Sequence, residues 1–195
     1  MFNFYDNFAG TSLNTSKWVS VASGGSYTVN NGITVSSGSS YDFIIGKILQ
    51  VYPQIVESYL PTTPSGISFG LGLTTTQSIG SDNGAPYSSY SLESYNGWEL
   101  RYEISSGGGS VSTVSHTWSP GIYGLAWVNT GNENTYFNYV SQLSGTDTKA
   151  TISNYYPYIA MWNGGGSQVY QWVRTRAYPP NGVMPSVSFG GLSTA

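Results

Sequence analysis

Short segments rich in β-branched and aromatic residues recur along the whole chain, and turn clusters separate them. Runs such as Gln54–Leu60 and Gly121–Val128 have the length of strands, and no segment spaces its apolar residues at the 3.6-residue period of a helix. Asn30–Gly32 can supply the positive φ of a tight hairpin, and Gly107–Gly109 and Gly164–Gly166 can form flexible hairpin tips. About a dozen short strands with this punctuation predict an all-β protein, either a sandwich or a barrel.

The length and the charge of the chain limit the number of domains and the kinds of partner. The 195 residues fit one domain that can bury a core without disulfides. Six Lys plus Arg against nine Asp plus Glu leave no basic patch for nucleic acid or an anionic membrane surface. The absence of Cys excludes disulfides and thiolate sites. No apolar run approaches the roughly 18 residues of a membrane span, so we expect neither membrane insertion nor a nucleic-acid partner.

The N-terminus does not begin with a basic segment followed by an apolar run. Either the chain is not exported by the signal-peptide route, or the sequence starts after a removed signal, and we favour the second. The sparse charge implies a surface of Ser, Thr, Asn, Gly and Tyr, which is common in secreted, cell-surface and virion proteins. We therefore expect an extracellular or cell-surface location, or a virion surface.

The two ends of the chain contain its most recognisable segments. Phe4–Trp18 combines a short aromatic strand, a glycine turn and a tryptophan that enters the next strand. Tyr170–Tyr178 is typical of one long strand, on which Tyr170, Trp172, Arg174, Arg176 and Tyr178 would share a face. Pro179 and Pro180 would end this strand. We expect one domain over residues 1–178 and a C-terminal extension over 179–195, which is either an additional edge strand or the start of a linker.

These ends and the segments between them resemble, in their order, a concanavalin A-like (laminin-G-like) jelly-roll domain of the kind found in archaeal surface proteins. Ile55–Tyr59 resembles its early strand, and Gly66–Gly72 resembles the glycine-rich strand that follows. Trp98–Ile104 and Ile122–Val128 resemble its paired central strands. The resemblance covers residues 2–178 and implies an antiparallel β-sandwich. It implies little about function, because the same sandwich hosts lectins, glucanases and scaffolding domains.

Glucanases of this fold carry catalytic carboxylates on one strand, in a Glu-x-Asp-x-(x)-Glu arrangement that puts them on one face. The comparable segment is Glu99–Glu103, but its middle position is Arg101, which would hold both glutamates ionised. Glu57 resembles one catalytic glutamate of small jelly-roll xylanases, yet no Glu follows Glu133 to supply the second. We therefore expect no catalysis, with Glu57 a structural partner of the arginines in the closing strand. A glycoside hydrolase stays the least favoured alternative.

Metal ligands are sparse. His116 is the only histidine, so a zinc site or a histidine-based triad lacks most of its parts. The resemblance implies a Ca²⁺ candidate, because domains of this fold often hold Ca²⁺ with backbone carbonyls and one or two carboxylates. The candidate ligands are Asp42, Asp82, Glu133, Asp147 and, as the least arbitrary, Asp6. Apart from this Ca²⁺, we expect no cofactor.

Aromatic residues give the remaining signal, with six Trp, 17 Tyr and seven Phe. Tyr and Trp on loops offer flat apolar faces on which sugars stack, while neighbouring amides bind the sugar hydroxyls. The carbohydrate-binding candidates are Tyr95, Trp98, Tyr155, Tyr156, Tyr158, Trp162 and Asn163. The same side chains would also suit protein assembly, because Tyr and Trp are enriched at interfaces.

From these observations we expect a non-catalytic, lectin-like domain that binds carbohydrate or a surface glycan and serves adhesion. The alternative is a structural protein, a self-assembly module of a surface layer, filament or virion. In that case the partner would be a second copy of the chain, in a homo-oligomer.

Overall fold

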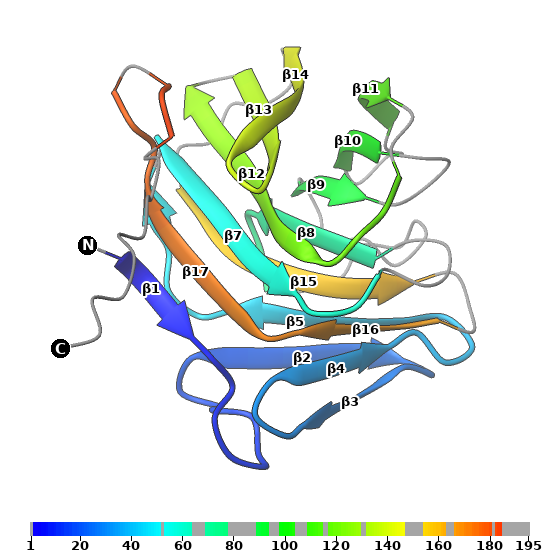
Figure 1. Cartoon of the computed structure of the whole chain (residues 1–195). Coiled ribbons are helices and arrows are strands. Elements are labelled where there is room, and N and C mark those ends of the chain that lie inside the picture. The colour runs from blue at the N-terminus through cyan, green and yellow to red at the C-terminus, as the bar shows by residue number, and fades with distance from the viewer. Residues whose placement is uncertain are drawn as a thin grey trace, which may run out of the picture.

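A computed structural model of the chain describes residues 2–51, 53–63, 69–77, 89–93, 98–103, 109–114, 117–129, 132–146, 154–162, 166–180 and 182–184. These residues form strands β1 to β17, which pair in three sheets, and they include no helix (Figure 1). Within this described part, no helix is long and apolar enough to span a membrane. The predicted all-β architecture of antiparallel strands is confirmed.

Sheet A joins the first and last strands of the domain. Its strand order is β1-β17-β7-β12-β13-β14. The bounds are β1 (Phe2–Asp6), β17 (Trp172–Ala177), β7 (Gln54–Leu60), β12 (Gly121–Asn129), β13 (Asn132–Phe137) and β14 (Val140–Thr146). Pairing of β1 with β17 brings the two ends of the domain together at one edge of this sheet, and β14 forms the other edge.

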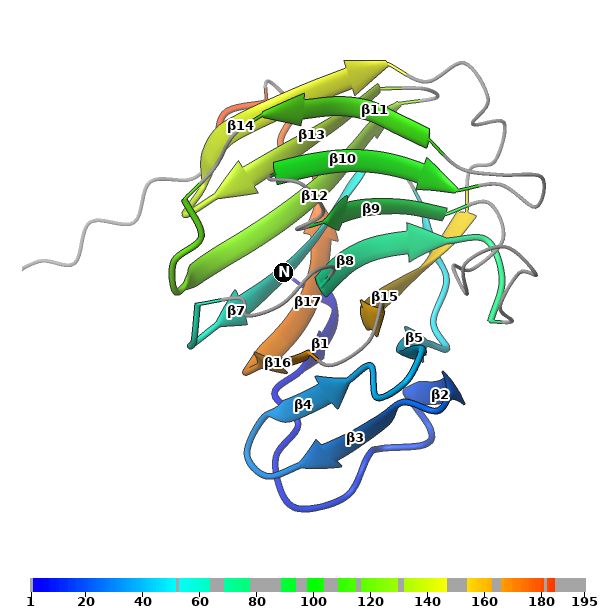
Figure 2. The ribbon, with the colours of Figure 1, turned by 90° about the vertical axis from the view of Figure 1, so that its right-hand side faces the viewer.

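Sheet B packs against sheet A and has the strand order β11-β10-β9-β8-β15-β5-β2, with β6 paired to β15. Its strands are β2 (Trp18–Ser23), β5 (Tyr41–Gly46), β6 (Gln50–Val51), β8 (Phe69–Thr74), β9 (Ser89–Glu93), β10 (Trp98–Glu103), β11 (Gly109–Val114) and β15 (Asn154–Trp162). The edge strands β11 and β14 of the two sheets lie side by side along the top of Figure 2. The sandwich is therefore closed on that side.

Sheet C is small, and its strands β3 and β4 lie at the bottom of both views, beside β2 of sheet B (Figures 1 and 2). It contains β16 (Ser167–Tyr170), β4 (Ile33–Ser36) and β3 (Ser26–Val29), in that order. The predicted hairpin turn between β3 and β4 is confirmed, because Asn31 has φ 49° and Gly32 has φ 142°. Tyr170 fixes sheet C to sheet B: its buried hydroxyl lies 3.0 Å from the carbonyl oxygen of Gly70 and 2.8 Å from that of Ala160.

The core lies between sheets A and B and is unusually aromatic. Alternate residues of each strand point into it, among them Phe4, Trp18, Ile44, Val56, Leu71, Leu92, Tyr123, Leu125, Trp127, Tyr155, Ile159 and Val173. Trp18 is fully buried, its ring lies 4.9 Å from that of Phe4, and its indole N–H donates to Asp6 at 2.8 Å. The N-terminal segment is thus anchored by both apolar packing and a buried hydrogen bond.

On the outer face of sheet A, Glu57 holds β7 to β17. Its side chain is 2% exposed and accepts hydrogen bonds from Nε of Arg174 at 2.7 Å and from Nη2 of Arg176 at 2.7 Å. Arg174 also lies over the rings of Phe2 and Trp172, each 4.7 Å from the guanidinium carbon. The expectation that Glu57 is a structural partner of these arginines is confirmed.

Three details differ from the sequence predictions. The closing strand is broken at Gln171, so Tyr170 belongs to β16 and is buried apart from the face that Trp172, Arg174 and Arg176 share. The segments expected to form paired central strands, Trp98–Ile104 and Ile122–Val128, contribute β10 to sheet B and β12 to sheet A. Strand β14 was not predicted, because its polar sequence lacks a clear apolar alternation.

The described part of the C-terminal extension packs on sheet A. Met184 joins the small cluster of Ile55, Ala126, Tyr136 and Tyr178, and its sulfur lies 3.1 Å from Nη2 of Arg176. Residues 185–195, where the additional edge strand was expected, lie outside the described residues.

Replacing Glu57 with glutamine should destabilise the fold. The change leaves two largely buried guanidinium groups without their countercharge, which typically lowers the free energy of unfolding by about 3–5 kcal/mol. Urea denaturation of E57Q against the parent protein measures this loss. The matched control is K17Q, which removes the more exposed pair of Lys17 with Asp6, 3.8 Å apart, and should lower the free energy by less than about 1 kcal/mol. Equal effects of the two variants would contradict the structural role of Glu57.

Candidate functional site

The outer face of sheet B carries a second apolar cluster, separate from the core. Ile44 of β5, Leu71 of β8 and Ile159 of β15 point into the core. Their neighbours along each strand therefore lie on the opposite, outer face of the sheet. There Phe43, Ile45, Tyr158 and Ala160 are buried, with Val19, Val21, Tyr41 and Tyr156 partly buried around them. The Phe43 ring centroid lies 5.7 Å from those of both Tyr41 and Tyr158. We call these eight residues the outer-face cluster.

Strand β8 offers no side chain beside this cluster. Gly70 pairs with Ala160, and Gly72 pairs with Tyr158, so the β8 positions on this face carry only hydrogen atoms until Thr74. Two glycines weaken a strand unless close approach to the backbone is needed. The cluster is therefore bordered by a flat strip of backbone.

Beyond this strip, two glutamates occupy directly paired positions on neighbouring strands. Glu93 of β9 is the register partner of Glu99 of β10, and Glu93 also pairs with Gly70. Leu92 is buried in the core and pairs with Leu100, so the positions of Glu93 and Glu99 belong to the outer face. Directly opposed residues of antiparallel strands have Cβ atoms roughly 4.5–5.5 Å apart, and like charges there are destabilising.

The register places these glutamates in line with the outer-face cluster. One row of paired positions runs across the sheet from Glu99 through Glu93, Gly70 and Ala160 to Phe43. The next row runs through Arg101, Ser91, Gly72, Tyr158 and Ile45. The outer face of sheet B thus combines a pair of carboxylate positions, a glycine strip and an aromatic cluster.

The predicted carbohydrate-binding aromatics are only partly brought together. Tyr156 and Tyr158 lie in the outer-face cluster, where Tyr156 keeps part of its surface exposed and Tyr158 is 1% exposed. Trp162 pairs in register with Tyr41 beside them. Tyr155, in contrast, points into the core with its ring centroid 4.9 Å from that of Trp127, and its 2% exposure leaves no face for a sugar.

Three candidates of that prediction remain, namely Trp98, Tyr95 and Asn163. Trp98 is the register partner of Val114 at the start of β10. Tyr95 and Asn163 lie outside the described residues.

The Ca²⁺ candidate Asp6 has partners of its own. It accepts hydrogen bonds from the backbone N–H of Phe8 and from the indole N–H of Trp18, both at 2.8 Å, and Lys17 lies 3.8 Å away. Over the residues that the structure describes, no three His, Cys, Asp or Glu side chains gather as metal ligands. Ca²⁺ binding at Asp6 stays a prediction.

Asp42 is a buried titratable group behind this face. It lies on the core side of β5 and is fully buried; Ser20 donates a hydrogen bond to Oδ1 at 3.1 Å, while Oδ2 has no hydrogen-bond partner among the described residues. Burial raises the pKa of Asp42 to about 6, against the lowering effect of the Ser20 hydrogen bond.

The sequence analysis missed Glu93 because it searched for carboxylates along a single strand. Glu57, the other glutamate weighed there, lies on sheet A, whereas β10 lies in sheet B. The signal that could have revealed Glu93 is the pairing of Leu92 with Leu100 in a hairpin, which sets Glu93 opposite Glu99. The two opposed glutamates therefore come from two different strands, β9 and β10.

The sequence matches no protein-family model and no curated protein. Its fold matches a glycosyl hydrolase family protein from Mycobacterium fortuitum, with a TM-score of 0.64, 10% identity, and coverage of 90% of this chain and 100% of that one. It also matches β-agarase A in complex with oligoagarose (TM-score 0.63, 14% identity, 89% of this chain and 90% of that chain). A third match is an immunostimulatory antigen and pseudo β-1,3-glucanase of Mycobacterium tuberculosis (TM-score 0.61, 11% identity, 89% and 98%).

These comparisons confirm the predicted concanavalin A-like jelly roll. They contradict the expected adhesion domain, and its assembly alternative, because the structures that share the fold are described as glycoside hydrolases, glucanases and agarases. One of these is described as a pseudo-glucanase, so both hydrolases and a pseudo-enzyme have this fold. The archaeal origin stays a prediction.

Replacing Asp42 with asparagine should stabilise the protein at neutral pH. Because the pKa in the fold is about 6 and the unfolded value is 3.8, the fold favours the protonated acid. The contribution of Asp42 to stability is therefore complete below about pH 4 and is lost as pH rises through about 6. Urea denaturation should show D42N to be more stable than the parent at pH 7.5, with the difference shrinking toward pH 4. A difference that does not change with pH would contradict the assignment.

Proposed function

We propose that this protein is a glycoside hydrolase that cleaves a β-linked neutral polysaccharide at the outer face of sheet B, with Glu93 and Glu99 as its two catalytic carboxylates. The observation that carries the proposal is their direct register pairing on β9 and β10. Directly opposed residues of antiparallel strands have Cβ atoms roughly 4.5–5.5 Å apart. Two glutamates at such positions can bring their carboxyl groups to the roughly 5–5.5 Å separation that retaining glycosidases need.

The surroundings favour different roles for the two glutamates. Glu93 neighbours Gly70, which is buried beside the outer-face cluster, whereas Glu99 neighbours the exposed Thr113. In a glycosidase the general acid occupies the less polar of the two environments. We therefore assign Glu93 as the general acid and Glu99 as the nucleophile.

The reaction then follows two steps. Glu99 attacks the anomeric carbon and forms a glycosyl ester, while Glu93 gives its proton to the departing glycosidic oxygen. In the second step Glu93 takes a proton from water, whose oxygen attacks the same carbon and releases Glu99. Each step inverts the configuration at the anomeric carbon, so the two steps together retain it. Both glutamates return to their initial protonation states.

The flat strip and the aromatic cluster would position the sugar. Gly70 and Gly72 carry no side chain on this face, although both are buried in the fold, and Tyr156 offers a partly exposed aromatic side chain on the same face. The fold neighbours described as a β-1,3-glucanase and an agarase complexed with oligoagarose suggest β-1,3-glucan and agarose as the first substrates to test.

Substitution of either glutamate should abolish hydrolysis. E93Q and E99Q should each lower kcat by about 10²–10⁴-fold, which is the range for loss of a positioned acid or base. Release of reducing ends from β-1,3-glucan and agarose measures the rate, and NMR of the first product measures the anomeric configuration. E103Q is the matched control, because Glu103 shares the strand and face of Glu99 but pairs with Ser89.

Three outcomes would contradict this proposal. One is that the parent protein cleaves neither polysaccharide. Another is that E93Q and E99Q retain the activity of E103Q. The third is that the first product has the inverted configuration.

A further inference from the structure

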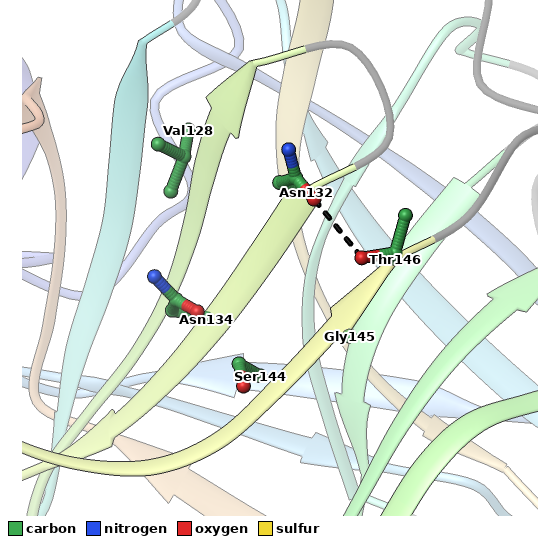
Figure 3. Close-up of a pocket in the computed structure, with 6 residues that line it drawn as sticks. All are labelled: Val128, Asn132, Asn134, Ser144, Gly145 and Thr146. Atoms are coloured by element: carbon green, nitrogen blue, oxygen red, sulfur yellow. Dashed lines mark hydrogen bonds between the residues drawn. The ribbon is translucent and has the colours of Figure 1, made fainter.

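A groove of about 380 Å³ lies on the outer face of sheet A, between the ends of β12, β13 and β14 (Figure 3). It is lined by Val128, Asn132, Asn134, Ser144, Gly145 and Thr146. The two sheets pack with their inner faces together, so this groove and the proposed active site lie on opposite sides of the sandwich. The groove therefore needs an explanation of its own.

Strand pairing builds the groove from four hydrogen-bonding side chains. Asn134 pairs in register with Ser144, and Asn132 pairs with Thr146, which makes two adjacent rows across β13 and β14. Between them on β13, Glu133 is fully buried toward the core. The alternation of the strands thus gathers two carboxamides and two hydroxyls on the outer face.

The side chains of Asn134 and Ser144 each have a hydrogen-bonding atom without a partner in the described part of the chain. Asn134 donates from Nδ2 to the hydroxyl of Tyr178 at 3.2 Å, while its Oδ1 accepts no hydrogen bond from any described residue. Tyr178 is itself held by the hydroxyl of Tyr136 at 2.7 Å, so the carboxamide of Asn134 has a fixed direction. Ser144 is exposed, and its hydroxyl makes no hydrogen bond within the described chain.

In the second row, Asn132 and Thr146 are already hydrogen-bonded to each other. Thr146 donates from Oγ1 to Oδ1 of Asn132 at 3.0 Å, as the dashed line in Figure 3 shows. Val128 is half-buried beside these polar groups and gives one wall an apolar surface. The groove thus offers both hydrogen-bonding groups and an apolar contact.

The lining restricts the chemistry of the ligand. None of the six lining residues is charged, so the groove has no group to neutralise a phosphate or a carboxylate and too few acidic oxygens for a cation. An apolar ligand would bury Oδ1 of Asn134 and the hydroxyl of Ser144 without a hydrogen-bond partner. A neutral polyhydroxylated ligand can donate to Oδ1 of Asn134 and can both donate to and accept from Ser144.

We propose that this groove is a second saccharide-binding site, which holds one or two units of a neutral polysaccharide on the side of the sandwich opposite Glu93 and Glu99. Strand β14 is the edge of sheet A, so the groove lies at the rim of that sheet. The site does not require catalysis, and its existence is independent of the proposed hydrolase activity.

NMR titration of the ¹⁵N-labelled E93Q variant tests the site without turnover. The probes are a β-1,3-glucan hexasaccharide and an agarose hexasaccharide. We expect at least one of them to shift the backbone amides of Ser144 and Gly145 and the side-chain amide of Asn134 in a saturable manner. S144V, which fills the groove with methyl groups at an exposed position, should weaken this binding about tenfold, as should N134A.

The matched control is Q142A, which lies on β14 two residues before Ser144 and outside the groove lining. It should leave the affinity unchanged, and S144V should leave hydrolysis of the hexasaccharides by the otherwise unaltered protein unchanged. Absence of saturable shifts at the groove with both probes, or equal affinity of S144V and Q142A, would overturn the second site. Groove binding without any turnover by the parent protein would support the site and overturn the hydrolase, so the two proposals fail separately.

Discussion

The buried carboxylate of Glu57 is the interaction on which sheet A depends. A charge at 2% exposure would cost several kcal/mol without partners, and here two arginines from β17 supply the compensating charge and hydrogen bonds. Because β17 pairs with β7 on one side and β1 on the other, this network fixes the register of the strands that join the two ends of the domain. Only one register places Arg174 opposite Glu57, since a shift of one residue would turn both arginines into the core.

Local patterns in the sequence were enough to predict many strands, while pairing across long sequence distances was not predictable from them. The alternation in Trp172–Ala177 and the turn at Asn31 and Gly32 are local properties, and both were predicted correctly. Tyr155 and Tyr156 are neighbours with the same chemical character, yet one points into the core and the other lies on the outer face. Which one does so depends on the register of β15 against β8, which no local pattern specifies.

The candidate site was missed for the same reason. Glu93 gains its significance from Glu99, and their relation is a property of two paired strands. The search for carboxylates on one strand therefore ended at Arg101 and favoured an adhesion domain. In a chain with nine acidic residues, two at directly opposed positions are a strong deviation from what charge repulsion favours, and such strain is more often found at functional sites.

Tyr170 has a consequence for how the sandwich transmits force. Its hydroxyl contacts the carbonyl oxygens of Gly70 and Ala160, which are register partners in the same row as Glu93. That row is therefore supported from behind by a rigid aromatic side chain that belongs to sheet C. A displacement of β16 would therefore reach the backbone of β8 and β15 through this one side chain. Sheet C thus contributes to the spacing of two central strands of sheet B from the core side.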